Sequence, residues 1–260
     1  LKLKMGGVLA DDMGLGKTLQ VIATLVWAKE KLGQKTSIVV APTSLVYNWQ
    51  AEIQKFTPHM RTVVLSGGKD DRRKQAEDIE KVDVLIASYA QIRRDIEWLE
   101  QISFRFCILD EAQQIKNAAS VGAGAVKRIQ AQSRFALTGT PMENHPGELW
   151  SIFDFVLPGY LNSFAQFMHR FGTGEEADVL RSRIRPFLLR RLKGDVLREL
   201  PEKVDAPVAA GQLLGTLRYV AGNETIASVP ISAAESVERV GVGELWVRLA
   251  AALCGRTNTQ

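Results

Sequence analysis

The 260-residue chain contains few of the residue types that build metal centres or disulfide frameworks. It has two cysteines, Cys107 and Cys254, and three histidines, His59, His145 and His169. Two cysteines cannot form a disulfide framework or a Cys-rich zinc site, which indicates a reducing compartment. Three histidines disfavour a histidine-built metal centre.

Long apolar runs and a strong charge bias are also missing. No stretch approaches the roughly 18 uncharged apolar residues of a membrane-spanning helix. The opening residues show no apolar core or cleavage site of a signal peptide. We therefore expect residues 1–203 to have no membrane partner. The formal net charge of +4 permits a nucleic-acid partner without arguing for one.

Lysine is absent from residues 204–260, although fourteen lysines are spread over residues 1–203. At a uniform rate, about four lysines would be expected in a segment of this length. The composition therefore changes near residue 203. Either the tail is a lysine-poor part of one protein, or residues 204–260 have a separate origin.

Up to residue 203, apolar runs alternate with amphipathic stretches. The expected strands cover residues 7–10, 37–41, 62–65, 82–87, 104–109 and 134–138, and runs among them such as IVVA, VLIA and FCILD lack polar alternation. The expected helices cover residues 18–32, 45–55, 72–79 and 121–129. This rhythm predicts an α/β fold, a parallel sheet with helices on both faces. Functional groups should then lie at the carboxyl ends of the strands.

The first of these strand ends carries a candidate phosphate-binding loop, GVLADDMGLGKTLQ. Its glycines allow successive backbone amides to curl around phosphate oxygens, and the following helix N-terminus adds a partial positive charge. Lys17 would reach the β- and γ-phosphates, and the Thr18 hydroxyl would bind Mg²⁺. The predicted nucleotide-binding residues are Gly14, Leu15, Gly16, Lys17 and Thr18.

The loop departs from the strict pattern at one position. The usual first glycine of G-x-x-x-x-G-K-T is replaced by Asp11. A chance glycine turn is the alternative, but a strand before the loop and a helix after it favour nucleotide binding.

A later strand end carries two adjacent carboxylates, in FCILDEAQQIKN. In a sheet with a phosphate loop, Asp110 would hold Mg²⁺ and Glu111 would orient the attacking water. Adjacent acids are common on surfaces, so the pair gains meaning only from its place after an apolar strand. The next strand ends in LTGTP, which is either an ordinary turn or a further part of the site.

These motifs, in this order, resemble the first RecA-like lobe of superfamily-two helicase-like ATPases of the Swi/Snf type. The resemblance covers residues 6–203 and rests on DDMGLGKT, APTSLVYNW, SYAQI, LDEAQQIKN, LTGTPMEN, ELWSIFDFVLPGYL and FLLRRLKGDVLRELPEK. The last two separate this family from DEAD-box helicases. The resemblance implies a P-loop RecA-like lobe at residues 1–160, followed by a helical extension at 161–203 that ends in the LLRR and LPEK segments.

The resemblance implies an ATPase that uses ATP and Mg²⁺. Its implied catalytic residues are Lys17, Asp110, Glu111 and Gln113, and its implied metal ligands are Thr18 and Asp110. Many family members have His at the position of Gln113, where the residue helps to link the nucleotide site to a second lobe. Gln can still hydrogen-bond there.

The resemblance also implies contacts to the phosphate backbone of double-stranded DNA, which give affinity without reading sequence. These contacts fall on Pro42, Thr43, Trp49, Ser88, Tyr89, Thr138, Thr140, Arg190 and Arg191. Residue type alone leaves two alternatives open. Trp49 could be a core aromatic on an amphipathic helix, and the two arginines could be solvated charges.

Family members move along duplex DNA by hydrolysing ATP and remodel protein–DNA complexes. Hydrolysis needs an arginine finger from a second lobe, whose Q-x-x-G-R-x-x-R-x-G-Q pattern does not occur in residues 204–260. Two functions therefore stay open: a DNA-dependent ATPase lobe, or a non-enzymatic nucleotide- or DNA-binding fragment. The resemblance implies a cytoplasmic, nucleoid-associated protein of bacterial type.

Residues 204–260 follow a different pattern. Two β-type runs, 213–220 and 224–229, flank the turn pair 222–223 and predict a hairpin. The positions that predict an apolar-faced helix after it are Leu245, Leu249 and Leu253.

This β-rich tail is similar to the C-terminal β domain of penicillin-binding D-Ala-D-Ala carboxypeptidases, which belongs outside the cytoplasmic membrane. That location conflicts with a cytoplasmic motor. We therefore predict a chimera of two unrelated parts, and keep an envelope-associated interaction domain as a third functional hypothesis.

Overall fold

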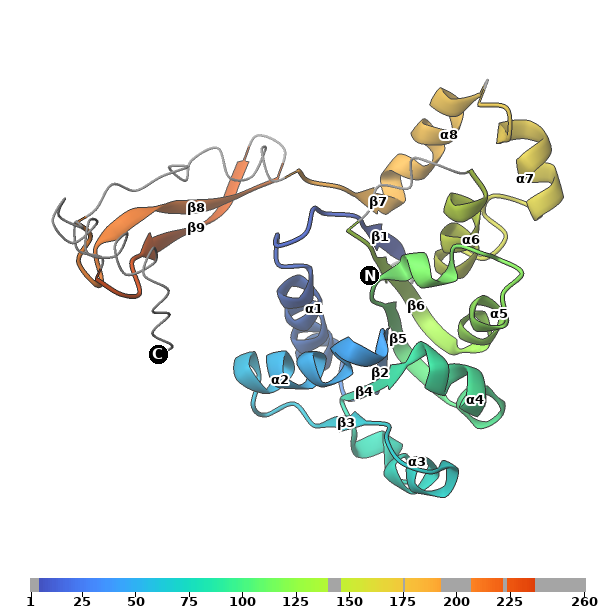
Figure 1. The fold of residues 1–260 in the computed structure, drawn as a ribbon, viewed down its shortest axis with the longest axis horizontal. Helices are drawn as coiled ribbons and strands as arrows, with labels where there is room; N and C mark the ends of the chain where they lie inside the picture. The colour runs from blue at the N-terminus through green and yellow to red at the C-terminus, as the bar shows by residue number, and fades with distance from the viewer. Residues whose placement is uncertain (1–4, 140–145, 175, 193–206, 222–223, 237–260) are drawn as a thin grey trace, which may run out of the picture. The chain divides into compact units, whose positions relative to one another are not determined.

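Seven strands form the main sheet of the computed structural model, and each neighbouring pair runs parallel. Their order across the sheet is β3-β4-β2-β5-β6-β1-β7 (Figure 1). The strands are β1 (Gly7–Leu9), β2 (Ser37–Ala41), β3 (Thr62–Val64), β4 (Val84–Ser88), β5 (Ser103–Leu109), β6 (Gln130–Leu137) and β7 (Leu188–Leu189). The structure describes residues 5–139, 146–174, 176–192, 207–221 and 224–236.

Helices connect these strands and extend the chain beyond β6. They are α1 (Lys17–Leu32), α2 (Val46–Phe56), α3 (Lys69–Gln75), α4 (Tyr89–Leu99), α5 (Val121–Arg128), α6 (Pro146–Val156), α7 (Phe164–Phe171) and α8 (Ala177–Ile184). Four short 3-10 turns lie among them: η1 (Thr43–Leu45), η2 (Ile79–Lys81), η3 (Ala112–Ile115) and η4 (Arg185–Phe187).

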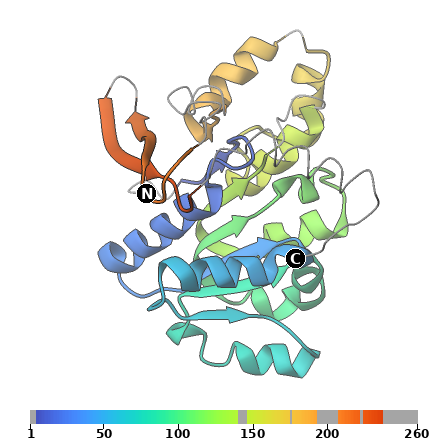
Figure 2. The same ribbon diagram turned by 60° about the vertical axis from the view of Figure 1, so that its left-hand side comes forward.

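The sheet is covered on both faces. The apolar sides of α1 and α2 pack on one face, whereas α4, α5 and α6 pack on the other, together with α7 and α8 (Figures 1 and 2). Along β2 the side chains alternate between these two layers, with Val39 in the first and Val40 in the second. Every residue of β2 and β4 is buried, as expected for parallel strands covered twice. The predicted α/β fold is confirmed.

Helix α4 and strand β7 are among the elements of this unit that were not predicted. Helix α4 begins with a capping box, in which the Ser88 hydroxyl accepts from the Gln91 amide at 3.2 Å, and the Gln91 side chain accepts from the Ser88 amide at 2.7 Å. Strand β7, from the predicted helical extension, pairs with β1 and makes the edge of the sheet. The predicted helix at 72–79 instead spans Lys69–Gln75, and η2 follows it.

The chain divides into two compact units, Leu1–Leu192 and Lys193–Gln260. In the second unit β8 (Leu213–Ala221) and β9 (Glu224–Ser232) form an antiparallel hairpin, which confirms the predicted β-rich segment. Thr140, the LPEK segment, the turn pair 222–223 and the helix predicted around residue 249 lie outside the described residues. The domain boundaries at residues 160 and 203 stay predictions.

Candidate nucleotide site

The predicted phosphate loop connects the end of β1 to the start of α1. Gly14 has φ 86° and Gly16 has φ 73°, a left-handed conformation that is unfavourable for side chains with a Cβ. Gly16 is also the residue before the first turn of α1. That first turn contains no acidic residue, so the first backbone N–H groups of the helix keep their attraction for an anion.

Lys17 is folded back onto the loop. Its ammonium donates to the carbonyl oxygen of Asp11 at 2.7 Å and to that of Asp12 at 3.3 Å. A Cβ placed on Gly139, at the end of β6, would lie 3.7 Å from Lys17 Nζ. The loop, the lysine and the end of β6 therefore meet at the carboxyl edge of the sheet, where sequence analysis placed them.

Asp110 continues β5 at the same edge. Its amide donates to the Val40 carbonyl at 2.8 Å, and its carboxylate accepts from Trp49 Nε1 at 2.8 Å and from the Glu111 amide at 3.0 Å. Burial raises the pKa of Asp110 above the usual carboxyl value. The Trp49 hydrogen bond and the Lys17 ammonium act against this rise, whereas the neighbouring Glu111 carboxylate adds to it.

Glu111 has a strained backbone, and its side chain takes part in a series of hydrogen bonds that crosses the site. Its φ is 48°, a left-handed value that is uncommon for residues other than glycine. Glu111 Oε2 accepts from Gln113 Nε2 at 2.6 Å, and Gln113 Oε1 accepts from the Thr138 hydroxyl at 3.2 Å. Gln113 thus connects the acidic pair on β5 to the end of β6.

Four residues predicted to contact DNA have side chains that point into the protein. Trp49 is only 2% exposed and bonds to Asp110, so its alternative assignment as a core aromatic is correct. Ser88 is buried as the cap of α4, and buried Thr138 bonds to Gln113. The Tyr89 hydroxyl donates to the Asp110 carbonyl at 2.8 Å, and burial raises its pKa well above the usual value. These side chains thus support the candidate site in the structure, and the DNA contact of the segments that carry them stays a prediction.

The remaining predicted DNA contacts lie nearer to solvent. Pro42 is half-buried and Thr43 is exposed, at the start of η1 after β2. Arg190 is exposed just after β7. Arg191, by contrast, is bonded to Asp11, and this contact takes up the guanidinium group that was predicted to bind DNA or face solvent.

Sequence analysis missed Asp11 as a member of the site. The only signal was its place in the phosphate-loop pattern, where the residue type was wrong for the motif. In the structure Asp11 is fully buried, and its carboxylate accepts hydrogen bonds from Arg191 and Gln20.

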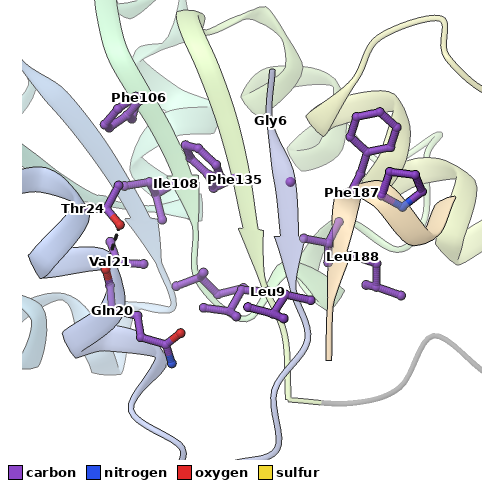
Figure 3. A pocket seen from close by; sticks show the side chains of 15 residues that line it. Gly6, Leu9, Gln20, Val21, Thr24, Phe106, Ile108, Phe135, Phe187 and Leu188 are labelled. Atoms are coloured by element: carbon purple, nitrogen blue, oxygen red, sulfur yellow. Dashed lines mark hydrogen bonds between the residues drawn. The ribbon is translucent and has the colours of Figure 1, made fainter. Parts of the chain in front are cut away.

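An apolar cavity of about 440 Å³ lies beside α1, over β5, β6 and β1 (Figure 3). Val21 and Thr24 of α1 line one side, and Phe187 and Leu188 line the other. None of the predicted nucleotide residues lines it. Gln20, at one end of the cavity in Figure 3, belongs both to its lining and to the Asp11 contact.

Neither a metal-ligating cluster nor a membrane-spanning helix occurs in the described ranges. No group of three or more His, Cys, Asp or Glu residues is placed to hold a metal ion there. No helix within those ranges is long and apolar enough to cross a membrane.

A glycine-rich loop between a buried parallel strand and a helix, with an acidic pair at the same sheet edge, defines an α/β domain of the P-loop class. Residues 2–209 match the family model of the SNF2-related domain. The chain belongs to this family, and the Swi/Snf-type resemblance of its first 203 residues is confirmed.

Relatives and a solved structure agree with this membership. The chain is 42% identical over 205 residues to an uncharacterized ATP-dependent helicase of Mycoplasma genitalium, covering 77% of this chain and 20% of the relative. It is 40% identical over 230 residues to the TATA-binding protein-associated factor BTAF1 of Arabidopsis thaliana, covering 78% and 11%. The chain thus spans a fifth or less of these relatives.

The solved structure is the SWI2/SNF2 ATPase core of Sulfolobus solfataricus in complex with dsDNA. The TM-score is 0.71 at 39% identity, over 82% of this chain and 46% of that one. In the tail, residues 195–239 match the model of the penicillin-binding protein 5 C-terminal domain. The two family matches overlap between residues 195 and 209.

Proposed function

We propose that the first unit is the ATP-binding lobe of a DNA-dependent ATPase that couples hydrolysis to movement along duplex DNA. The observation that carries this proposal is the meeting of Lys17, the glycine loop and the Asp110–Glu111 pair at one edge of the sheet. The names of the helicase relative and of the DNA-bound ATPase core support it.

The residues at this edge fit a nucleotide triphosphate and Mg²⁺. The loop amides and Lys17 would hold the phosphates once the ammonium leaves the Asp11 and Asp12 carbonyls. Thr18 and Asp110 would hold Mg²⁺, which supplies charge neutralisation at the phosphate oxygens. Because no three-carboxylate cluster is present among the described residues, phosphate oxygens and water would complete the shell, as Mg²⁺ usually requires.

The buried side chains around the acidic pair would then orient it. Trp49 and the Glu111 amide fix the two oxygens of Asp110. Gln113 holds one oxygen of Glu111, which leaves the other to accept a proton of the attacking water. The Thr138 hydroxyl holds Gln113 in turn. A movement of the backbone at the end of β6 would therefore be passed through Gln113 to the Glu111 carboxylate.

The proposed duplex contact uses the polar groups that remain near solvent. Thr43 and Arg190 are exposed, and hydroxyl and guanidinium groups bind phosphates without reading bases. Protein–DNA complexes are the proposed targets of the movement, in a cytoplasmic, nucleoid-associated setting.

ATP hydrolysis by the 260-residue chain tests the proposal, with and without duplex DNA, beside Lys17→Ala and with Mg²⁺ removed by a chelator. We expect turnover that rises with DNA and disappears in the variant and without Mg²⁺. Nucleotide binding without turnover above the Lys17→Ala level would instead support a binding module.

We also propose that residues 204–260 have a separate origin, since residues 195–239 match the penicillin-binding protein 5 C-terminal domain. The lysine boundary, the division of the chain at Leu192 and the second family match support this. Sequencing the gene across codons 190–215 in an independent isolate tests it. A reading frame that continues there into the second lobe of the SNF2-related family would identify the tail as an accidental joining, whereas the same junction would show a natural fusion.

A further inference from the structure

A charged contact joins the first residue of the phosphate loop to the end of the first unit. The buried Asp11 carboxylate accepts from the Arg191 amide at 2.9 Å and from its guanidinium Nε at 3.1 Å, and Nη2 is a further donor. The two residues are 180 positions apart in the sequence. The Arg191 side chain is one-third exposed, at 33%, while the aspartate side chain is at 0%.

Gln20, in the first part of α1, connects this pair to the middle of the loop. Its Oε1 accepts from Arg191 Nη2 at 2.7 Å. Its Nε2 donates to the Leu15 carbonyl at 3.1 Å and lies 3.4 Å from Asp11 Oδ2. Because Leu15 lies between the two left-handed glycines, the contact network reaches both the start and the glycine turn of the loop.

The backbone follows the same route. The Ala10 amide donates to the Leu189 carbonyl at 2.7 Å, and the Asp12 amide donates to the Arg191 carbonyl at 3.1 Å. The pairing of β1 with β7 therefore continues beyond both strands and runs along the start of the loop. Asp11 therefore binds two cationic side chains: its backbone carbonyl accepts from Lys17, and its carboxylate accepts from Arg191.

We propose that Arg191 is a positioning residue for the phosphate loop, and that the Arg191–Asp11–Gln20 network couples nucleotide binding to residues 188–192 of the first unit. The inference rests on the proposed nucleotide site. A buried carboxylate without its cation is strongly unfavourable, so the loop keeps this conformation only while Arg191 is in place. A nucleotide that orders the loop must, by reciprocity, hold Arg191 more firmly.

The test combines affinity for Mg²⁺–ADP, followed with a fluorescent ADP analogue, and amide hydrogen exchange of the full chain. Arg191→Ala should weaken ADP binding roughly tenfold if the ordered loop falls to about a tenth of the population. Arg191→Lys, which keeps the charge but loses the forked geometry, should restore part of this loss. In the nucleotide-free protein, Arg191→Ala should speed exchange at residues 10–16, and ADP should slow exchange at residues 188–192 of the wild type.

Two controls separate positioning from general stability. Arg72 forms an even more deeply buried ion pair with Asp95 between α3 and α4, outside the network. Arg72→Lys should therefore lower stability and leave ADP affinity unchanged. Arg185→Ala, an exposed position in η4, should change neither quantity.

ADP affinity and exchange at residues 10–16 that match the wild type in folded Arg191→Ala would overturn the coupling. Weaker DNA binding with unchanged ADP affinity would also overturn it, because Arg191 would then serve DNA. If the wild type and Lys17→Ala both fail to bind ADP, the proposed function fails. The exchange rates of residues 10–16 without nucleotide then decide alone whether Arg191 holds the loop.

Discussion

The hydrogen bond from Trp49 to Asp110 should make an unusually large contribution to stability for a single side-chain contact. Trp49→Phe keeps an aromatic ring in the core but removes the indole N–H that donates to the Asp110 carboxylate at 2.8 Å. A hydrogen bond to a charged group contributes about 1.5–3 kcal/mol. We expect the free energy of unfolding to fall by at least this amount, because the smaller ring also leaves a cavity.

The chain offers a matched control in Trp98. Its indole N–H is buried with no hydrogen-bond partner in the described part of the chain. Trp98→Phe removes the same atoms without breaking a bond, and it also removes an unsatisfied donor whose burial is unfavourable by about 1–3 kcal/mol. The relief of this unsatisfied donor opposes the cavity left by the smaller ring, so we expect Trp98→Phe to destabilise the unit less than Trp49→Phe.

Urea unfolding followed by circular dichroism measures both variants. With a slope of about 2 kcal/mol per molar urea, the Trp49→Phe midpoint should fall by roughly 1 M. A double-mutant cycle with Asp110→Ala separates the hydrogen bond from the cavity term. Equal destabilisation by the two substitutions, or a coupling energy near zero in the cycle, would refute this account of Trp49.

Three further predictions concern other parts of the first unit. Arg72→Ala should lower the free energy of unfolding by roughly 3–5 kcal/mol, because it leaves Asp95 buried without its cation; Arg128→Ala, which breaks a surface pair with Glu100, should leave urea unfolding unchanged. Burial raises the pKa of Cys107 to about 12. Its thiol should therefore stay unmodified by iodoacetamide at pH 8 in the folded protein and react in urea, which peptide mass spectrometry would measure. Modification under native conditions would contradict the burial. Gly6→Ala should destabilise the unit, because its Cβ would lie 2.0 Å from the Arg134 carbonyl oxygen. In α5, by contrast, the Cβ of Gly122→Ala meets nothing within 4 Å. Gly122→Ala should raise the thermal midpoint, because the higher helix propensity of alanine contributes about 0.5–1 kcal/mol.

The sequence predicted those parts of the fold that depend on local pattern. Continuous apolar runs such as 37–41 and 104–109 became buried strands, because a parallel sheet covered on both faces requires them. Helix α4 was missed although its signal was present. Ser88 followed three residues later by Gln91 is a capping box, and Ile92, Ile96 and Leu99 repeat at helical spacing.

The parts that could not be predicted depend on contacts between distant segments. β7 has two residues, too few to show a pattern, and exists because β1 offers it an edge. The position of Trp49 on α2 predicted a helix face, but only the folded sheet brings its indole to Asp110. The role of Arg191 was missed for the same reason, since no local rule relates it to Asp11.

The position of β1 in the sheet has a consequence for synthesis. It is made before the other described strands, yet its two neighbours, β6 and β7, are both made much later. At about 5–20 residues per second, the ribosome needs roughly 9–36 s to add the 180 residues that separate Asp11 from Arg191. β1 has no paired neighbour until β6 is made, and Asp11 lacks its ion-pair partner until Arg191 is made. The loop expected to bind nucleotide should therefore be among the last parts of the unit to form, and a nascent chain should reach its full nucleotide affinity only after Arg191 has left the ribosome.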